Sequence, residues 1–117
     1  MGTVIPNHTE NLKHAAGAEK NSVKFIPPEV ILQLGAVMKH GADKYQPYDW
    51  RKNGADLGTY YDAAQRHLLA IWSGEWLDEG MGGSGLPHAA HVMACMAIIL
   101  DAENRGNLSG KISDYPG

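Results

Sequence analysis

The sequence predicts an all-α fold, a compact bundle of three main helices with a loose N-terminal arm and an irregular C-terminal tail. Three long segments carry apolar residues at helical spacing, whereas no stretch of useful length alternates as a half-buried strand would. The 117 residues, of which 44% are hydrophobic and 20% charged, suit one globular domain. We expect its core at about residues 23–105.

The first helix is expected to open at Pro27, Pro28 and Glu29. Proline is tolerated in a first turn, where its missing N–H would have no partner, and the glutamate suits the positive end of the helix dipole. Gly41 follows two basic residues and is predicted to end this helix. Residues 1–24 are polar and aperiodic and are predicted to form the arm. The apolar stripe comprises Val30, Ile31, Leu34, Val37 and Met38.

A loop is predicted over residues 41–55, which contain two glycines, a proline and three large aromatic residues. The second helix is predicted over residues 57–73, with Asp56 or Thr59 as its N-cap. Its apolar residues recur at helical spacing, so one face should be buried. That face comprises Leu57, Tyr60, Tyr61, Ala64, Leu68, Ile71 and Trp72.

A second glycine-rich loop, residues 75–86, leads into a third helix predicted over residues 87–104. Nearly every residue from 89 to 100 is apolar, so this helix should be buried on most sides and central to the fold. From Gly106 onward the chain is rich in glycine, asparagine and serine, and we expect it to be extended.

Composition limits the partners and the setting. The net charge of −3 argues against a protein that binds long nucleic acid, which would carry a basic stripe. Cys95 is the only cysteine, so no internal disulfide can form and a cytoplasmic setting is expected. The longest apolar run, residues 92–100, is shorter than the roughly 20 residues that span a membrane. A short chain has a modest core, which makes self-association reasonable, and a homo-oligomer is expected.

Two histidines stand at the head of the third helix. His88 and His91 are three residues apart, so their rings lie on the same face. The helix dipole disfavours a positive ring in the first turn, so His88 should stay neutral and available as a metal ligand or proton acceptor. Burying both rings at the start of an apolar helix requires specific partners.

Two acids and a further histidine could meet this pair. Glu75 and Asp78 lie in the glycine-rich loop, which could fold them over the histidines, and His67 lies at the edge of the second helix's apolar stripe. Asp101 is rotated far from both histidines. Carboxylates beside imidazoles suit Mg²⁺, Mn²⁺ or another transition metal. The alternative is a set of hydrogen-bonded core histidines without a ligand. The candidate metal ligands are His67, Glu75, Asp78, His88 and His91, with Glu75 also the candidate catalytic base.

The loop over residues 44–52 interleaves cations with aromatic rings. Aromatic faces can stack on a nucleobase, and arginine or lysine can hold phosphates. A loop that Trp50 anchors in the core, with its charges solvated, is equally consistent with the sequence. The glycines of residues 80–85 follow no predicted strand, so they match neither a dinucleotide fingerprint nor a P-loop. The candidate substrate-binding residues are Lys44, Tyr45, Trp50, Arg51, Lys52 and Arg66.

Six short patterns in order give the chain a family resemblance. They read I-P-P-E, G-A-x-K-Y, W-R-K, D-A-x-x-R-H-L-L, G-E-x-x-D and S-G-x-x-H-x-x-H, and they begin at Ile26, Gly41, Trp50, Asp62, Gly74 and Ser84. The chain resembles, over roughly residues 23–104, the phage-type dATP/dGTP diphosphohydrolase N-terminal domain family, distantly similar to MazG-type nucleotide pyrophosphohydrolases. The resemblance implies a purine deoxynucleotide partner, cleavage to a monophosphate and pyrophosphate, and the cytoplasm of a bacterial host.

Three hypotheses follow. The first is a metal-dependent nucleotide pyrophosphohydrolase that uses Mg²⁺ or Mn²⁺ to polarise the α-phosphate and activate water. The second is a non-catalytic phage protein that binds and sequesters a signalling nucleotide. The third is a structural module in which the histidines only satisfy one another.

Overall fold

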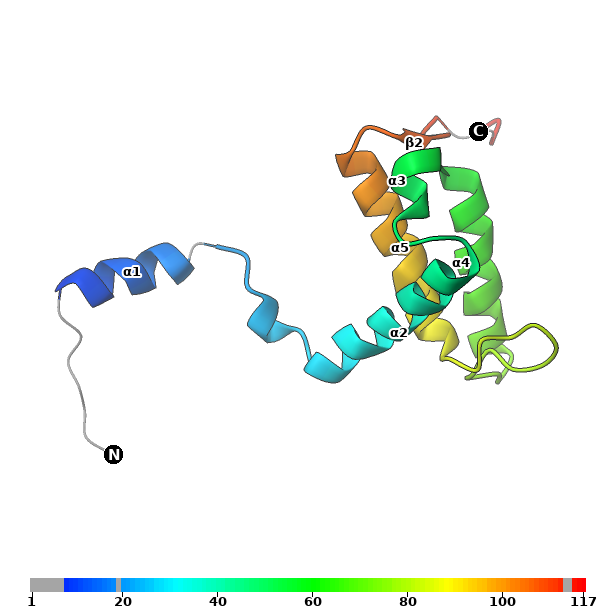
Figure 1. The fold of residues 1–117 in the computed structure, drawn as a ribbon, viewed down its shortest axis with the longest axis horizontal. Coiled ribbons are helices and arrows are strands. Elements are labelled where there is room, and N and C mark those ends of the chain that lie inside the picture. The colour runs from blue at the N-terminus through cyan, green and yellow to red at the C-terminus, as the bar shows by residue number, and fades with distance from the viewer. Residues whose placement is uncertain (1–7, 19, 113–114) are drawn as a thin grey trace.

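The computed structural model describes residues 8–18, 20–112 and 115–117, which form a helical body with an N-terminal arm extending from it (Figure 1). This arrangement confirms the prediction of an all-α fold with three main helices. The three bundle helices and a short one between them are α2 (Pro28–Lys44), α4 (Leu57–Trp72), α5 (His88–Asn104) and α3 (Asp49–Asn53).

Helix α5 is the centre of the body, because α2, α3 and α4 all contact it. The buried core is built mainly from small residues, so the helices approach closely while little apolar surface is enclosed. Although α5 is strongly apolar, no helix in the described part of the chain is long and apolar enough to cross a membrane. The main core cluster is Val37, Ala90 and Ala94, packed against Leu34, Met38, Leu86 and Met93.

Helix α4 begins where the sequence predicted. The Asp56 side chain is the N-cap and accepts a hydrogen bond from the Thr59 backbone N–H at 3.0 Å. At the other end, Ser73 is the C-cap and Gly74 leaves the helix with a φ of 97°, a conformation that glycine adopts without strain. The predicted boundaries of this helix are therefore confirmed within one residue.

The C-terminal tail packs back on the body through a pair of two-residue strands. Strand β1 (Ala55–Asp56) pairs in parallel with β2 (Leu108–Ser109). Just before β2, the Asn107 side-chain amide donates to the backbone oxygens of Trp50 and Arg51 at 2.9 and 3.1 Å. These contacts attach α3 to the end of α5, and the sheet stays as small as the sequence predicted.

Two local predictions are wrong. Helix α2 continues through Gly41 to Lys44, because Gly41 keeps a helical conformation and its carbonyl accepts from the Tyr45 N–H at 2.8 Å. Part of the predicted loop over residues 41–55 is therefore helical, including α3.

The N-terminal arm contains helix α1 (His8–Ala18) and a short 3₁₀ helix, η1 (Val23–Phe25). Helix α1 has no strong apolar face, so the spacing of apolar residues did not predict it. Residues 1–7 of the predicted arm lie outside the described residues.

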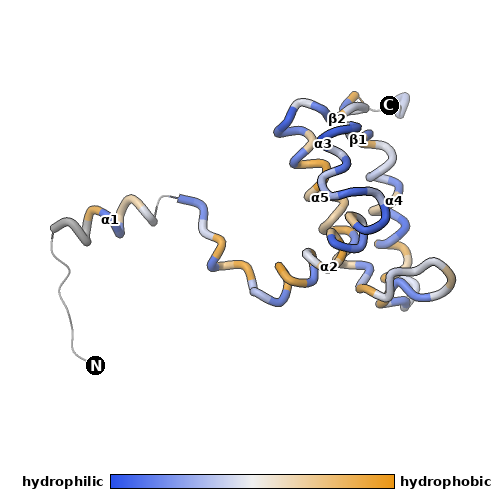
Figure 2. The backbone as a smooth tube through the Cα atoms, viewed as in Figure 1, coloured by the Kyte–Doolittle hydropathy of each residue, from blue (hydrophilic) through white to orange (hydrophobic). Residues whose placement is uncertain are grey.

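The predicted buried face of α4 is also partly wrong. Tyr61 is 57% exposed, Leu68 45% and Trp72 91%, because α5 covers α4 on one side only. Apolar residues also lie along the segment that precedes α2 and the start of that helix, where it leaves the body (Figure 2). The chain exposes 9370 Å², whereas a compact monomer of this mass would expose about 6,200 Å².

Candidate metal centre and neighbouring pocket

Three histidines from two helices meet at one end of the α4–α5 interface. The Nδ1 atoms of His67 and His88 lie 2.8 Å apart, which is a hydrogen bond in which one ring donates and the other accepts. The ring of His67 stacks on that of His91, with centroids 4.5 Å apart and planes within 9°. Helices α4 and α5 therefore bring the three imidazole rings together at one place.

The two acids reach these histidines from the connecting loop. Glu75 Oε1 lies 3.4 Å from His88 Nε2, and Asp78 Oδ2 lies 3.6 Å from His91 Nε2. The two ends of this loop pair in antiparallel fashion, at Leu77 and Pro87. Within this pairing the Asp78 N–H donates to the Leu86 carbonyl at 2.8 Å. This pairing folds both carboxylates over the first turn of α5, as the sequence predicted.

A glycine and a serine fix the loop around Asp78. A Cβ atom at Gly83 would overlap the carbonyl oxygens of Asp78 and Glu79, so this position has no room for a side chain. The Ser84 hydroxyl lies 2.6 Å from His91 Nε2 and 3.4 Å from Asp78 Oδ2. Sequence reasoning did not assign Ser84 a role, although it begins the S-G-x-x-H-x-x-H pattern.

One atom in this cluster has no hydrogen-bond partner within the described part of the chain. His88 is only 4% exposed, and its Nε2 is buried and unsatisfied. A buried polar atom without a partner costs free energy, so a bound cation would stabilise this arrangement. One ligand atom each from Glu75, Asp78 and His88 lie within 4.8 Å of one another. These three residues are the group that could hold a metal ion.

The surroundings favour neutral imidazoles beside this group. Burial lowers the pKa of His67, and the charge of His88 lowers it further, while Asp78 raises it. Burial also lowers the pKa of His91, as does the charge of His67. His40, which sequence reasoning missed, contacts His91 edge-on with ring centroids 6.5 Å apart. Neutral rings retain the lone pair that a metal ion requires.

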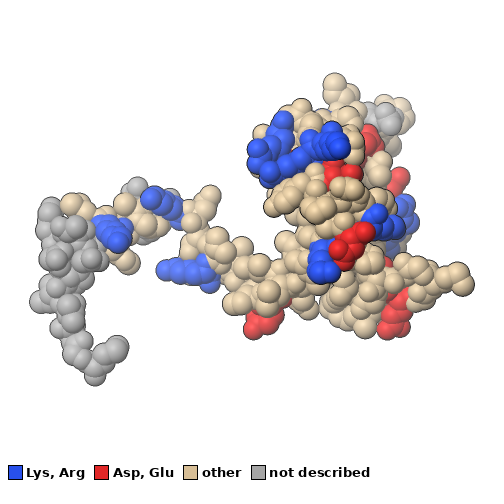
Figure 3. All heavy atoms as spheres, viewed as in Figure 1, with Lys and Arg blue, Asp and Glu red and all other residues tan. Residues whose placement is uncertain are grey.

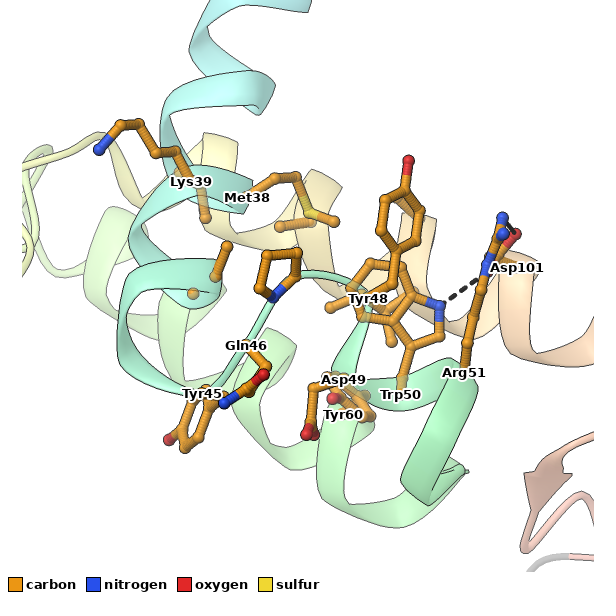
Figure 4. Close-up of a pocket in the computed structure, with 17 residues that line it drawn as sticks. Met38, Lys39, Tyr45, Gln46, Tyr48, Asp49, Trp50, Arg51, Tyr60 and Asp101 are labelled. Atoms are coloured by element: carbon orange, nitrogen blue, oxygen red, sulfur yellow. Dashed lines mark hydrogen bonds and ion pairs between the residues drawn. The ribbon is translucent and has the colours of Figure 1, made fainter.

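A pocket of about 650 Å³ lies between α2, α3 and α5, and none of the three candidate metal ligands lines it. At one end the Asp101 carboxylate accepts from the Trp50 indole N–H at 2.7 Å and from Arg51 Nε and Nη2 at 2.8 and 2.9 Å (Figure 4). These donors lower the pKa of Asp101 to about 2, Arg51 being the largest cause. Sequence reasoning separated Asp101 correctly from the histidines but gave it no role.

The structure divides the six candidate substrate-binding residues between different places. Tyr45, Trp50 and Arg51 line the pocket, and Lys44 lies over the Tyr45 ring at 5.2 Å. Lys52 is exposed on α3. Positive side chains gather at the end of the body where α3 meets the C-terminal end of α5 (Figure 3). Arg66 lies on α4 beside His67, and its charge contributes to lowering the pKa of that histidine.

An all-α body with an acid–histidine cluster beside an apolar pocket defines a candidate metal- and ligand-binding protein. Residues 10–111 match a family model described as dATP/dGTP diphosphohydrolase, N-terminal, and the chain belongs to this family. No curated protein and no solved structure shows a significant match. Membership indicates a function of the deoxynucleoside triphosphate diphosphohydrolase type, with a nucleotide as ligand.

Proposed function

We propose that this protein is a metal-dependent nucleotide pyrophosphohydrolase that acts on purine deoxynucleoside triphosphates and releases pyrophosphate. The observation that carries the proposal is the buried, unsatisfied Nε2 of His88, which lies 3.4 Å from Glu75 Oε1. A structural cluster would satisfy that atom within the protein, whereas a cation site needs its lone pair. Family membership supplies the nucleotide class.

The donor set fits a divalent cation. Bonds of about 2.0–2.2 Å to nitrogen and oxygen place neighbouring ligands about 3 Å apart and opposite ones about 4.3 Å apart. The three donor atoms lie within 4.8 Å of one another, a spacing at which Glu75, Asp78 and His88 would together hold one cation. Two carboxylates and one imidazole suit Mn²⁺ or Mg²⁺. We propose that His91 and His67 orient the metal ligands. His91 lies against Asp78, and His67 is hydrogen-bonded to His88.

The chemistry assigned to the chain is attack of water on the α-phosphorus. When bound, a divalent cation polarises the phosphate oxygens and offsets their charge. Glu75, whose side chain is half exposed, accepts the proton from the attacking water as general base. The new bond joins the water oxygen to phosphorus, the bond to the bridging oxygen breaks, and pyrophosphate leaves. Lys44, Arg51, Lys52 and Arg66 remain proposed substrate contacts, and Arg66, which lies beside His67, is the proposed phosphate contact among them.

We further propose a single domain, a homo-oligomer, and the cytoplasm of a bacterial host as the setting. The exposed apolar residues of α4, Trp72 above all, support association, because such side chains are usually covered in a stable protein. Size-exclusion chromatography with light scattering gives the mass in solution. A monomeric mass at micromolar concentration would contradict the oligomer.

The test is pyrophosphate release from the four deoxynucleoside triphosphates with Mg²⁺, Mn²⁺ or chelator. We expect turnover of dATP and dGTP that a chelator abolishes. Glu75→Gln should reduce turnover at least a hundredfold, whereas Glu79→Gln, an exposed acid in the same loop, should leave it nearly unchanged. Equal activity in both variants would refute the assigned site. Tight binding of nucleotide that is recovered intact would favour the non-catalytic binding protein instead.

A further inference from the structure

We infer that the pocket between α2, α3 and α5 binds the nucleoside part of the substrate, so that its phosphates extend toward the acid–histidine cluster. This inference rests on the proposed function and assigns a second subsite to it. The observation is independent of the metal centre, because the pocket and the cluster share no residue.

The size and walls of the pocket suit a base and sugar. Its volume of about 650 Å³ lies in the range of small-molecule sites, about 300–1,000 Å³. Aromatic rings contribute to its walls from α3, from α4 and from the residue that follows α2, and the apolar floor includes Ala97 and Ile98 of α5. These rings are Trp50, Tyr60 and Tyr45. Flat aromatic faces beside small apolar side chains accept a planar ring by stacking.

One end of the pocket offers hydrogen-bonding groups that could orient the ring. Arg51 uses its Nε and Nη2 atoms to hold Asp101. A guanidinium has five N–H donors, so further donors remain for acceptor atoms on a purine edge. Figure 4 shows Trp50, Arg51 and Asp101 together at this end, while Met38 and Lys39 lie toward the other. A fixed polar end with apolar walls is the usual design of a small-molecule site.

The opposite end of the pocket points toward the histidines. Ala94 and Gly41 line the pocket, and they follow His91 by one helical turn and His40 by one residue. With a rise of 1.5 Å per residue, Ala94 lies about 4.5 Å from His91 along the α5 axis. Because His40 and His91 contact each other, this end of the pocket adjoins the cluster. A nucleoside bound in the pocket with its 5′ carbon toward Ala94 would therefore direct its phosphates to the metal centre.

Residues 45–48, which connect α2 to α3, form the outer wall of the pocket and include one residue in an unfavourable backbone conformation. Tyr48 adopts a left-handed conformation with a φ of 56°, which is uncommon for a bulky residue. Its ring lies 4.6 Å from the Arg51 guanidinium and 5.4 Å from the Trp50 ring. Such strain persists where the surroundings hold it in place and is concentrated at ligand sites.

The first experiment uses the wild-type protein and ligands that separate the two subsites. Titration with deoxyguanosine or deoxyadenosine is followed by NMR at the tryptophan indole N–H groups. We expect the Trp50 signal to move, whereas those of Trp72 and Trp76, which are 91% and 59% exposed outside the pocket, stay in place. A second sample receives tripolyphosphate and Mg²⁺, which is diamagnetic and is used here in place of Mn²⁺. This ligand should leave the position of the Trp50 signal unchanged. No movement of Trp50 with either nucleoside would overturn the inference.

The second experiment fills the pocket. Ala97→Phe adds a ring inside it, and Met96→Phe adds the same ring at the preceding residue of α5, which does not line the pocket. We expect Ala97→Phe to raise KM for dGTP and dATP at least tenfold, with Met96→Phe close to wild type. Unchanged KM in a folded Ala97→Phe protein overturns the inference, although hydrolysis itself stands. Nucleoside binding at Trp50 without any turnover supports the pocket and refutes the proposed hydrolase. If Ala97→Phe does not fold, the wild-type titration decides.

Discussion

Removal of the His88 imidazole tests the metal centre without relying on activity. The perturbation is His88→Ala, with His40→Ala as the matched control, because the His40 ring contacts His91 but is not in the group that could hold a metal. The readout is the thermal shift that Mn²⁺ produces within each variant. Any loss of packing affects the protein with and without metal alike, so it cancels in this difference.

The expected magnitude follows from mass action. At a metal concentration of 100 times Kd, a site present only in the folded state stabilises it by about 2.7 kcal/mol. For a chain of 117 residues, this corresponds to a rise in Tm of about 10 °C. His88 supplies one of three donors, and we take its loss to weaken binding about 100-fold. The same metal concentration then contributes only about 0.4 kcal/mol, a rise of about 2 °C.

The assay is differential scanning fluorimetry or calorimetry across a Mn²⁺ titration, repeated with Mg²⁺. We expect a large shift in the wild type and in His40→Ala and a small one in His88→Ala. Equal shifts in the wild type and His88→Ala would refute the site, because the buried Nε2 atom would then have no part in binding. A wild-type protein that no divalent cation stabilises would refute the metal centre altogether.

Three further predictions concern the loop, α2 and the pocket. Gly83→Ala should displace the loop, because its Cβ would overlap the Asp78 carbonyl oxygen, and should abolish the Mn²⁺-induced thermal shift; a retained shift would show that the loop does not position the acids. Gly35→Ala has no atom within 4 Å of the added Cβ and should raise the free energy of unfolding in urea by about 0.5–1 kcal/mol; a loss of stability would contradict this. Arg51 and the Trp50 indole lower the pKa of Asp101 to about 2, so its stabilising effect is present above its ordinary pKa and is lost as pH falls through about 2. The stability difference between wild type and Asp101→Asn should thus be constant above pH 4 and shrink below it, and a difference that persists unchanged near pH 2 would exclude this carboxylate as the cause.

Local signals in the sequence determined the helices of the body and the composition of the cluster. Asp56 before the apolar stripe and Gly74 after it located α4, because caps depend on neighbours within a few residues. The spacing of His88 and His91 placed both rings on one face in the same way. The end of α2 was mispredicted, because a glycine favours the end of a helix by adopting a left-handed conformation, and Gly41 stays within the helix without one.

Tertiary structure alone decided how distant segments meet. Glu75 could be placed near His88 from the chain order, but the 3.4 Å separation depends on the return of the loop at Leu86. The same holds for Asp101, whose partners Trp50 and Arg51 lie about fifty residues earlier and come from α3. Periodicity reports which face of a helix is apolar, not which neighbour covers it, and for this reason Trp72 was expected to be buried and is exposed. The sequence thus determined the chemistry available at the site, and packing against α5 determined which groups act together.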